Sequence, residues 1–470
     1  MLTRLKVKGF KNLVDTEVRF GPFTCVAGLN GAGKSNLFDV IAFLSDLASH
    51  TIVEAASRVR MHEGGRSASL STLFARKGSN LWHDIELEVD FLVPKKVLDD
   101  FEREAIPSVT FLNYKVTLRY VQGNGSAERI ELREEDLTYV LKSESKKRIG
   151  FAVDKAFLDS VLGGTKRSDF IKTEKDADNR VVILLKGDKV TGPPSKIPAN
   201  TSPRTVLSTV NTDDRPTALA ARREMQSWSQ LQLEPSKLRA PDNFSGEEKI
   251  GPDGEHLPAT LLRLGNYEKV SNLLARLLPD IDSIRVDVDE ARKSKTVYLK
   301  QRDGVEHAAR SLSDGTLRFL ALAVLSCDPQ GGGVVCMEEP ENGIHPARIP
   351  AIVELLRDMA VDVTSAVGED NPMRQIIINT HSPTVIKSLD TRDLVVATPV
   401  RLGRSTVTTF AVISGTWRAQ EVYQGISAPP VTKATLIEYL EDQIGELPQD
   451  SNMDTVQTVA QWAQNSLEFE

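Results

Sequence analysis

The sequence is poor in cysteine and has no long apolar run. Its three cysteines, at positions 25, 327 and 336, form no C-x-x-C pair, which argues against a disulfide framework or a zinc site. The longest apolar run, near 319–327, is too short to cross a bilayer. The stretch MLTRLKVKGF alternates like a strand and lacks the apolar centre of a signal peptide. These absences predict a cytoplasmic protein with no membrane contact.

The chain also lacks a large excess of positive or negative charge. The net charge of −7 argues against a wholly basic nucleic-acid binder, but it leaves room for a local basic stripe. With 40% hydrophobic and 26% charged residues, the composition is that of an ordinary globular protein. Its 470 residues suffice for about three average domains or one large domain with insertions. No internal repeat or sustained heptad occurs, so a long coiled-coil arm is not expected.

The stretch GLNGAGKSN, residues 28–36, fits the phosphate-loop pattern G-x-x-x-x-G-K-[ST]. It follows the apolar strand FTCVA and precedes a helical segment, which is the context that this motif requires. Its glycines let backbone N–H groups surround phosphate oxygens, while Lys34 would reach the phosphates and Ser35 would ligate Mg²⁺. A chance glycine-rich turn is the alternative. The context favours a site for a nucleoside triphosphate.

Three later segments carry further polar residues at the ends of regular elements. SLSDGTLRFLALA (311–323) places Ser313 before an apolar helix, where a simple helix cap is the alternative. GGGVVCMEEPENGIHP (331–346) ends an apolar strand in Glu338 and Glu339, which suit a cation and a water but could also form a solvated strand end. RQIIINTHSP (374–383) ends another strand in His381, which taken alone would be structural.

In this order, the four motifs resemble those of an ABC-type ATPase head: phosphate loop, signature, Walker B with a catalytic glutamate, and switch histidine. More narrowly, they resemble the RecF/SMC/OLD-like branch of prokaryotic ATPases, without the TOPRIM domain that some relatives carry. The resemblance covers about 1–45 and 255–385, together with LEPSKLRAP and GPDGEHLPATLLRL. It is weak across 146–230 and absent after about 415.

The resemblance implies ATP and Mg²⁺ as ligands and assigns roles by position. Glu339 would polarise the attacking water, His381 would sense the γ-phosphate, and Glu338 would assist Ser35 with Mg²⁺. Glu341 and Asn342 occupy the place of the loop that crosses between protomers. Contacts with ATP would come from Lys11, Asn12, Gly28, Asn30, Gly31, Ala32, Gly33, Lys34, Ser35 and Asn36, and from Ser313 and Gly315 of a second protomer.

Two departures from the family pattern stand out. The first Walker B acid is Glu338, where many relatives have aspartate; this suits a metal contact through water. No glutamine occurs between residues 37 and 121, so the glutamine loop that contacts the metal in this family has no assigned position.

The resemblance implies an α/β fold: an ABC-ATPase head with a mixed central sheet, flanking helices and an antiparallel β subdomain. A helical or irregular insertion, with a mobile loop near 192–203, and a short helical C-terminal extension would complete it. The expected domains are the first half of the head (1–145), the insertion (146–280), the second half of the head (281–415) and the extension (416–470).

In such a head, each ATP is held between two protomers, so we expect a homodimer or a larger even-numbered assembly. Three functional hypotheses remain open: an ATPase of bacterial anti-phage defence that controls a separate effector nuclease or toxin, a RecF-like ATPase that acts on DNA in repair, and a slow-turnover scaffold. Without a membrane segment, transport is disfavoured.

Two further features bear on partners. Basic clusters would support DNA binding if they formed a groove, although solvated surface is the alternative. The segment TKATLIEYLEDQIGEL has helical periodicity and could pack on its own head or on a partner. The basic residues are Arg58, Arg60, Arg66, Lys146, Lys147, Arg148, Lys166, Arg167, Arg292, Lys293 and Lys295.

Overall fold

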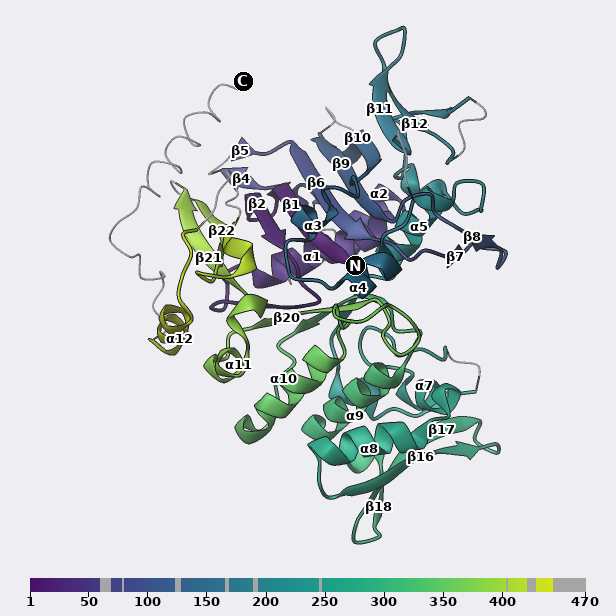
Figure 1. Ribbon diagram of the computed structural model, residues 1–470, viewed down its shortest axis with the longest axis vertical. Coiled ribbons are helices and arrows are strands. Elements are labelled where there is room, and N and C mark those ends of the chain that lie inside the picture. The colour runs from purple at the N-terminus through teal and green to yellow at the C-terminus, as the bar shows by residue number, and fades with distance from the viewer. Residues whose placement is uncertain are drawn as a thin grey trace.

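The computed structural model describes residues 1–59, 69–77, 80–122, 128–164, 169–188, 193–244, 247–402, 405–420 and 428–442. The chain forms two stacked sheets, with one helical layer between them and a second beyond the lower sheet (Figure 1). The expected fold class is therefore confirmed: a mixed central sheet with flanking helices and an antiparallel β subdomain.

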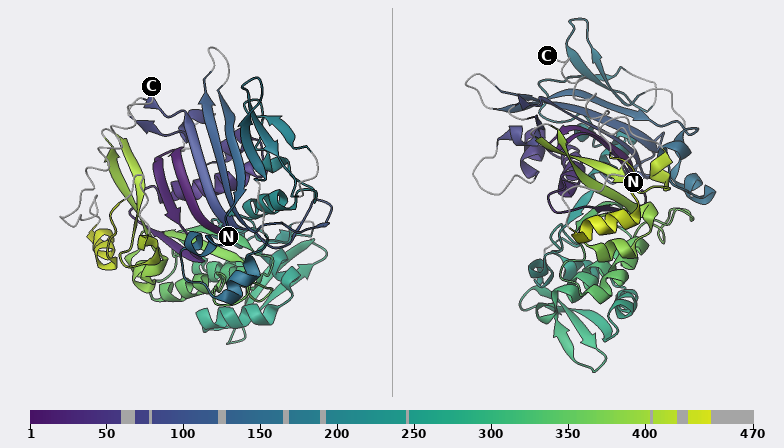
Figure 2. Two further views of the ribbon diagram at one scale, coloured as in Figure 1. Left: turned by 45° about the horizontal axis from the view of Figure 1, so that its top comes forward. Right: turned by 90° about the vertical axis from the view of Figure 1, so that its left-hand side faces the viewer.

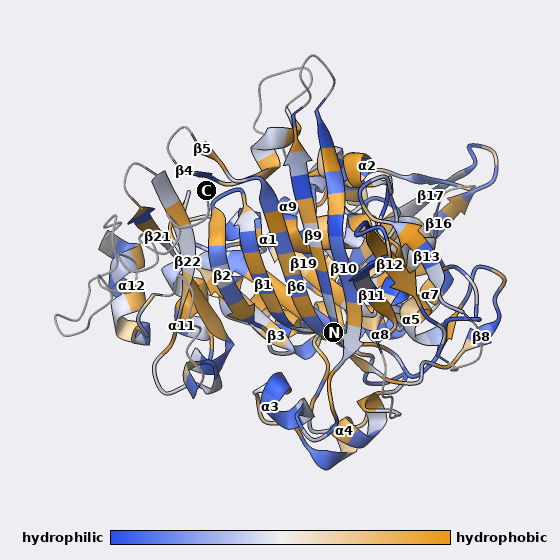
Figure 3. Cartoon of the chain, turned by 90° about the horizontal axis from the view of Figure 1, so that it is seen from above, coloured by the Kyte–Doolittle hydropathy of each residue, from blue (hydrophilic) through white to orange (hydrophobic). Residues whose placement is uncertain are grey.

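The upper sheet has eight strands in the order β13-β12-β11-β10-β9-β6-β1-β2, and every neighbouring pair is antiparallel. Apolar and charged residues alternate along its strands, so one face is buried and the other is polar (Figure 3). Its strands are β1 (Leu2–Phe10), β2 (Leu13–Arg19), β6 (Asp84–Leu92), β9 (Phe111–Val121), β10 (Arg129–Tyr139), β11 (Ile171–Lys175), β12 (Val181–Leu185) and β13 (Ser195–Pro198).

The lower sheet has six strands in the order β14-β19-β20-β3-β21-β22. All neighbouring pairs are parallel except β21 with β22. Its central strands are covered on both faces, which explains their almost continuous apolar sequences. The strands are β3 (Phe23–Ala27), β14 (Ser229–Leu231), β19 (Gly333–Glu338), β20 (Arg374–Thr380), β21 (Leu394–Leu402) and β22 (Ser405–Val412).

Two helices lie between the sheets, α1 (Lys34–Leu47) and α5 (Pro216–Gln226). They share one hydrophobic core with the buried face of the upper sheet and the upper face of the lower sheet, where Val26 points. The neighbouring Cys25 and Ala27 belong to the core on the other face, as the alternation of a strand requires. Figure 2 shows this layering from two further directions.

The second helical layer covers the lower face of the six-stranded sheet and carries a small antiparallel sheet at its far end (Figure 1). Its helices are α6 (Pro235–Leu238), α7 (Leu257–Leu264), α8 (Tyr267–Leu277), α9 (Asp314–Cys327), α10 (Ile349–Asp358), α11 (Pro383–Ser388) and α12 (Lys433–Asp442). The small sheet contains β15 (Asp242–Asn243), β16 (Ile281–Asp289), β17 (Ser294–Gln301) and β18 (Glu306–Ala308).

Short elements fill the edges of the molecule. No described helix has the length and apolarity needed to cross a membrane. The short helices and strands are α2 (Ile52–Arg58), α3 (Ser145–Ile149), α4 (Lys155–Val161), β4 (Arg76–Lys77), β5 (Asn80–Leu81), β7 (Val97–Leu98) and β8 (Glu104–Ala105), with 3₁₀ turns η1 (Leu70–Leu73), η2 (Leu207–Thr209), η3 (Ala309–Ser311), η4 (Pro346–Arg348), η5 (Thr391–Asp393) and η6 (Trp417–Gln420).

The segment 146–280 holds the largest departures from the sequence prediction. The mobile loop predicted near 192–203 begins at residue 192, which lies outside the described residues, and it includes β13, an edge strand that pairs with β12. Pro198 fits there because an edge strand leaves one side of its backbone unpaired. The insertion was expected to be helical or irregular, but its helix α5 ends at Gln226 and the strand β14 follows it. The domain boundaries themselves stay a prediction.

Helix α12 shows how part of the C-terminal amphipathic segment packs. Leu436 is fully buried in the same core as α11, and the Lys433 ammonium donates to the carbonyl of Leu389 after the end of α11. The predicted amphipathic segment thus packs on its own head over 433–442. The remainder of the C-terminal segment, from 443 to 470, lies outside the described residues.

Candidate active site

The phosphate loop connects β3 to α1 through backbone conformations that favour glycine. Gly31 and Gly33 have φ angles of 78° and 88°, in the left-handed region. A side chain at Gly28 would place its Cβ 2.7 Å from the carbonyl oxygen of Ala397. Two glycines therefore allow the turn and one allows the close approach of β21.

Lys34 opens helix α1 and turns back over the loop. Its Nζ donates hydrogen bonds to the carbonyls of Gly28, at 2.7 Å, and Leu29, at 2.9 Å. Burial lowers the pKa of this ammonium, while the nearby carboxylates of Glu339, Glu341 and Glu338 oppose that shift. The loop thus holds a buried cation where the sequence places a phosphate-binding lysine.

Glu338, at the end of β19, joins helix α1 to strand β14 of the lower sheet. One of its carboxylate oxygens accepts a hydrogen bond from the Ser35 hydroxyl at 3.0 Å. The other accepts from the side-chain amide of Gln230 on β14 at 2.7 Å. The structure therefore brings together a hydroxyl, a carboxylate and an amide from segments separated by up to 303 residues.

Gln230 was missed in the sequence. Residues 37–121 contain no glutamine, whereas Gln230 lies 108 residues before its partner Glu338 and on β14, the strand next to β19. The alternating segment WSQLQL after α5 was the available signal, because apolar–polar alternation is typical of a short strand.

Glu339 is the next residue after β19 and has a φ of 43°, which is rare for a residue with a side chain. One carboxylate oxygen is 2.7 Å from Nδ1 of His381, and the other accepts from the Asn342 amide at 2.8 Å. Burial raises the pKa of Glu339, but the hydrogen bonds from Asn342 and His381 outweigh it and leave the pKa below its usual value. This carboxylate is therefore held in its ionised form.

A cavity of about 700 Å³ lies over the phosphate loop and reaches both glutamates. Asn12 borders it and accepts a 2.6 Å hydrogen bond from Asn36. The Lys11 ammonium forms an ion pair with Asp39 of α1 at 2.9 Å. Of the predicted ATP-contacting residues, those that line the cavity are Lys11, Asn12, Asn30, Gly31, Gly33, Lys34, Ser35 and Asn36; Gly28 and Ala32 support the loop from behind.

The signature segment lies elsewhere. Ser313 caps α9 by accepting from the backbone N–H of Thr316, and Asp314 forms an ion pair with Arg239. Ser313 and Gly315 are not among the residues that line the 700 Å³ cavity, although Glu338 and Glu339 are. The same chain therefore does not place its signature over its own phosphate loop.

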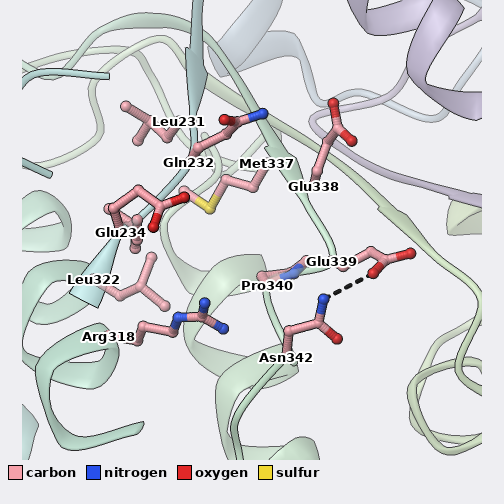
Figure 4. Close-up of a pocket in the computed structure, with 11 residues that line it drawn as sticks. Leu231, Gln232, Glu234, Arg318, Leu322, Met337, Glu338, Glu339, Pro340 and Asn342 are labelled. Atoms are coloured by element: carbon pink, nitrogen blue, oxygen red, sulfur yellow. Dashed lines mark hydrogen bonds between the residues drawn. The ribbon is translucent and has the colours of Figure 1, made fainter. Parts of the chain in front are cut away.

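A second cavity of about 290 Å³ lies on the other side of the two glutamates (Figure 4). Arg318 of α9 points into it, and the Nε of Arg318 is buried without a hydrogen-bond partner among the described residues. Gln232 and Glu234, which follow β14, complete the opposite wall. Glu338 and Glu339 line both cavities, whereas Asn342 lines only the second of these two.

Glu341 is buried beneath the site rather than displayed at the surface. It is 6% exposed and accepts a hydrogen bond from the Thr380 hydroxyl. Burial raises its pKa. Asn342, in contrast, donates a hydrogen bond from its side-chain amide to Glu339. Glu341 and Asn342 therefore have different surroundings.

The donor set fits a hard cation that a nucleotide helps to hold. Ser35, Glu338 and Gln230 offer oxygen ligands, which Mg²⁺ prefers. No three His, Cys, Asp or Glu side chains converge on a metal position within the described parts of the chain. Mg²⁺ is usually bound by one or two protein groups together with substrate phosphates.

A family model described as "AAA domain, putative AbiEii toxin, Type IV TA system" matches residues 23–387. Two curated relatives, each called DNA replication and repair protein RecF, match shorter segments. The protein of Parabacteroides distasonis is 45% identical over 51 residues, 11% of this chain and 14% of the relative. That of Phocaeicola vulgatus is 38% identical over 65 residues, 14% and 17% of the two chains. The matched segments thus span less than a fifth of these relatives.

Solved structures of SMC heads are also similar to the chain. The SMC head bound to the C-winged helix domain of ScpA is 15% identical, with a TM-score of 0.46 over 87% of this chain and 98% of that one. The SMC head domain from Thermotoga maritima is 12% identical, with a TM-score of 0.40 over 88% and 99%.

Proposed function

This chain belongs to the AAA domain family whose model it matches over 23–387, and from that premise we propose that it hydrolyses ATP to ADP and phosphate. The observation that carries the proposal is the convergence of Lys34, Ser35, Glu338 and Glu339 on one cavity. Phosphoryl transfer depends mainly on positioning and on neutralising charge. Lys34 supplies a positive charge, whereas Ser35, Glu338 and Glu339 would position Mg²⁺ and the attacking water.

Each side chain has a role that follows from its surroundings. The loop N–H groups and Lys34 bind the phosphates, while Ser35 and Glu338, with Gln230, would hold Mg²⁺, which supplies charge neutralisation when bound. Glu339 is ionised, so it can accept a hydrogen bond from the attacking water and orient it. The Nδ1 of His381 lies 2.7 Å from Glu339, so His381 would fix the direction of that carboxylate. The family resemblance gives it the further role of sensing the γ-phosphate.

We further propose that the complete site forms between two copies of the chain. The signature residues Ser313 and Gly315 lie outside the chain's own nucleotide cavity, at the N-terminal end of α9. The positive end of a helix dipole suits phosphate, so this end would contact ATP held by a second protomer. ATP would then join two heads and hydrolysis would release them, because an equilibrium shifts only when the ligand favours one state.

Substitution of Glu339 tests both parts. We expect Glu339→Gln to retain ATP binding while turnover falls about 10²-fold or more, because the water loses its acceptor. Sedimentation of this variant with ATP and Mg²⁺ should show a dimer or a larger even-numbered assembly, and a monomer without nucleotide. A monomer under saturating ATP would contradict the shared site, and undiminished turnover would contradict the role of Glu339.

For the biological role, we propose bacterial defence through a separate effector, nuclease or toxin, that the dimer controls. The family description, which names a toxin–antitoxin system, supports it. Co-purification of an effector with Glu339→Gln in ATP, lost in ADP, is the expected result. An effector retained equally in both nucleotides would contradict ATP control.

The RecF-like segments favour DNA as an alternative partner. Against it, the described basic residues lie on separate elements (Figure 1): α2, α3 and the hairpin of β16 and β17. Arg58 and Arg148 are already paired with Asp46 and Asp90. Arg60, Arg66, Lys166 and Arg167 lie outside the described residues.

The polar face of the upper sheet also argues against DNA as the partner. Lys6 and Lys8 of β1 lie opposite Glu88 and Glu86 of β6, so each positive side chain has an acidic neighbour across the strands. A polyanion would have to displace these acids. DNA-stimulated ATP hydrolysis that falls steeply with salt would support the DNA alternative, and its absence would favour a protein effector.

A further inference from the structure

One buried threonine on β22 joins two loops that border the nucleotide cavity. Thr408 is 2% exposed, and its hydroxyl donates to the carbonyl of Ala32 in the phosphate loop at 2.8 Å. Its backbone N–H donates to the carbonyl of Asn12 at 2.9 Å. We propose that Thr408 is a positioning residue that holds the phosphate loop and the Lys11–Asn12 turn in the geometry needed to bind the triphosphate.

The direction of a peptide plane explains how a residue behind the loop could affect its front. A trans peptide is planar, so the Ala32 carbonyl and the Gly33 N–H point to opposite sides. When the Thr408 hydroxyl holds the carbonyl, it also fixes the Gly33 N–H on the side away from β22. Backbone N–H groups are what a phosphate loop offers to its ligand, so their orientation governs affinity.

The contact is close enough to restrict the loop itself. A Cβ at Gly33 would lie 2.0 Å from the Thr408 hydroxyl oxygen and 2.8 Å from the Asn12 amide nitrogen. Asn12 in turn accepts from Asn36 of α1. Thr408, Asn12 and the loop therefore form one packed unit, in which the loop conformation depends on a side chain almost four hundred residues away.

This strand lies outside the segment that the family model matches, which ends at residue 387. It also continues into the C-terminal part of the chain, because Val431 pairs with Ile413 directly after β22 and α12 follows. Thr406 and Val407, next to Thr408, line the outer part of the cavity. The C-terminal hairpin would thus complete a nucleotide site whose recognised motifs all precede it.

The matched control is Thr398 on the neighbouring strand β21. It is also buried, at 7% exposed, but its hydroxyl has no hydrogen-bond partner among the described residues. Thr398→Val and Thr408→Val therefore make the same chemical change in the same hairpin, and only the second removes a bond to the loop. Thr408→Ser keeps the hydroxyl and loses one methyl group.

The inference rests on the proposed ATP site, so the test has one readout with ATP and one without. In the full chain, Thr408→Val should raise the dissociation constant and KM for ATP about tenfold. The kcat should change little, since the backbone N–H groups of the loop bind the phosphates in the ground state and the transition state alike. Thr408→Ser should restore affinity to within about twofold, and Thr398→Val should leave it unchanged.

Hydrogen–deuterium exchange without nucleotide gives the second readout. Amides at 31–36 should exchange faster in Thr408→Val than in Thr398→Val. If the unaltered protein does not bind ATP, the proposed function fails, while faster exchange would still support the contact with the loop. Unchanged affinity and exchange in Thr408→Val, or equal losses in both valine variants, would overturn the role of Thr408.

Discussion

Glu338 shows how much one side chain can organise in this molecule. Its two carboxylate oxygens are occupied by different partners, the Ser35 hydroxyl from α1 and the Gln230 amide from β14. A carboxylate held from both sides has little freedom to turn away from a ligand. The orientation of Glu338 therefore depends on Gln230, which belongs to none of the four recognised motifs.

We predict that Gln230→Ala lowers the rate of ATP turnover about tenfold, because residues that orient a metal-binding carboxylate typically contribute 10- to 100-fold. Gln232→Ala is the control, since Gln232 is two residues further along and lines the second cavity. Steady-state ATP hydrolysis over a range of Mg²⁺ concentrations measures the effect. Equal rates in the two variants would show that the Gln230 contact has no functional role.

At the scale of elements, a buried carboxylate fastens η2 to the upper sheet. Glu135 of β10 is fully buried and accepts from the backbone N–H groups of Val206, at 2.6 Å, and Leu207, at 2.8 Å. The Tyr114 hydroxyl of β9 is a third donor. Burial raises the pKa of Glu135 to about 7, against the opposing effect of these hydrogen bonds.

This junction predicts a pH dependence of stability. Between pH 4.5 and 7 the folded protein keeps a proton that the unfolded chain has released, so stability falls as pH rises through this window. Relative to Glu135→Gln, the wild-type free energy of unfolding should fall by about 3 kcal/mol from pH 4.5 to pH 8. Urea titrations at several pH values measure this, with the exposed Glu174→Gln as control. A difference that does not vary with pH would refute the prediction.

At the scale of the whole molecule, the proposed site is divided between copies of the chain. The phosphate loop lies beneath the upper sheet, whereas the signature residues open α9 in the second helical layer. A chain altered at the phosphate loop and a chain altered at the signature should therefore form one intact site when they meet in a mixed dimer. This would not occur if one chain held a complete site.

We predict that Lys34→Ala and Ser313→Arg each abolish ATP turnover, and that an equal mixture recovers up to about a quarter of the wild-type rate. Half of the dimers would be mixed, and each of these has one intact site. Turnover assays after mixing and exchange of subunits measure the recovery. A mixture as inactive as its components, although sedimentation shows mixed dimers, would exclude the shared site.

The sequence alone identified the phosphate loop, the helix cap at Ser313 and the two glutamates at a strand end, because each depends on a local pattern of a few residues. The resemblance of these motifs to those of an ABC-type ATPase head also implied the α/β class. Local patterns carry no information on which distant strands become neighbours. Gln230 was missed for this reason, since β14 and β19 meet only in the folded sheet.

The tertiary structure decided the remaining features of the site. It placed Asn342 and His381 on the two oxygens of Glu339, buried Glu341, and brought Thr408 behind the phosphate loop. It also kept the signature apart from the chain's own cavity. The contacts of His381 and Thr408 join segments that meet only at the edge of the folded six-stranded sheet. The order of its strands depends on the packing of the whole chain.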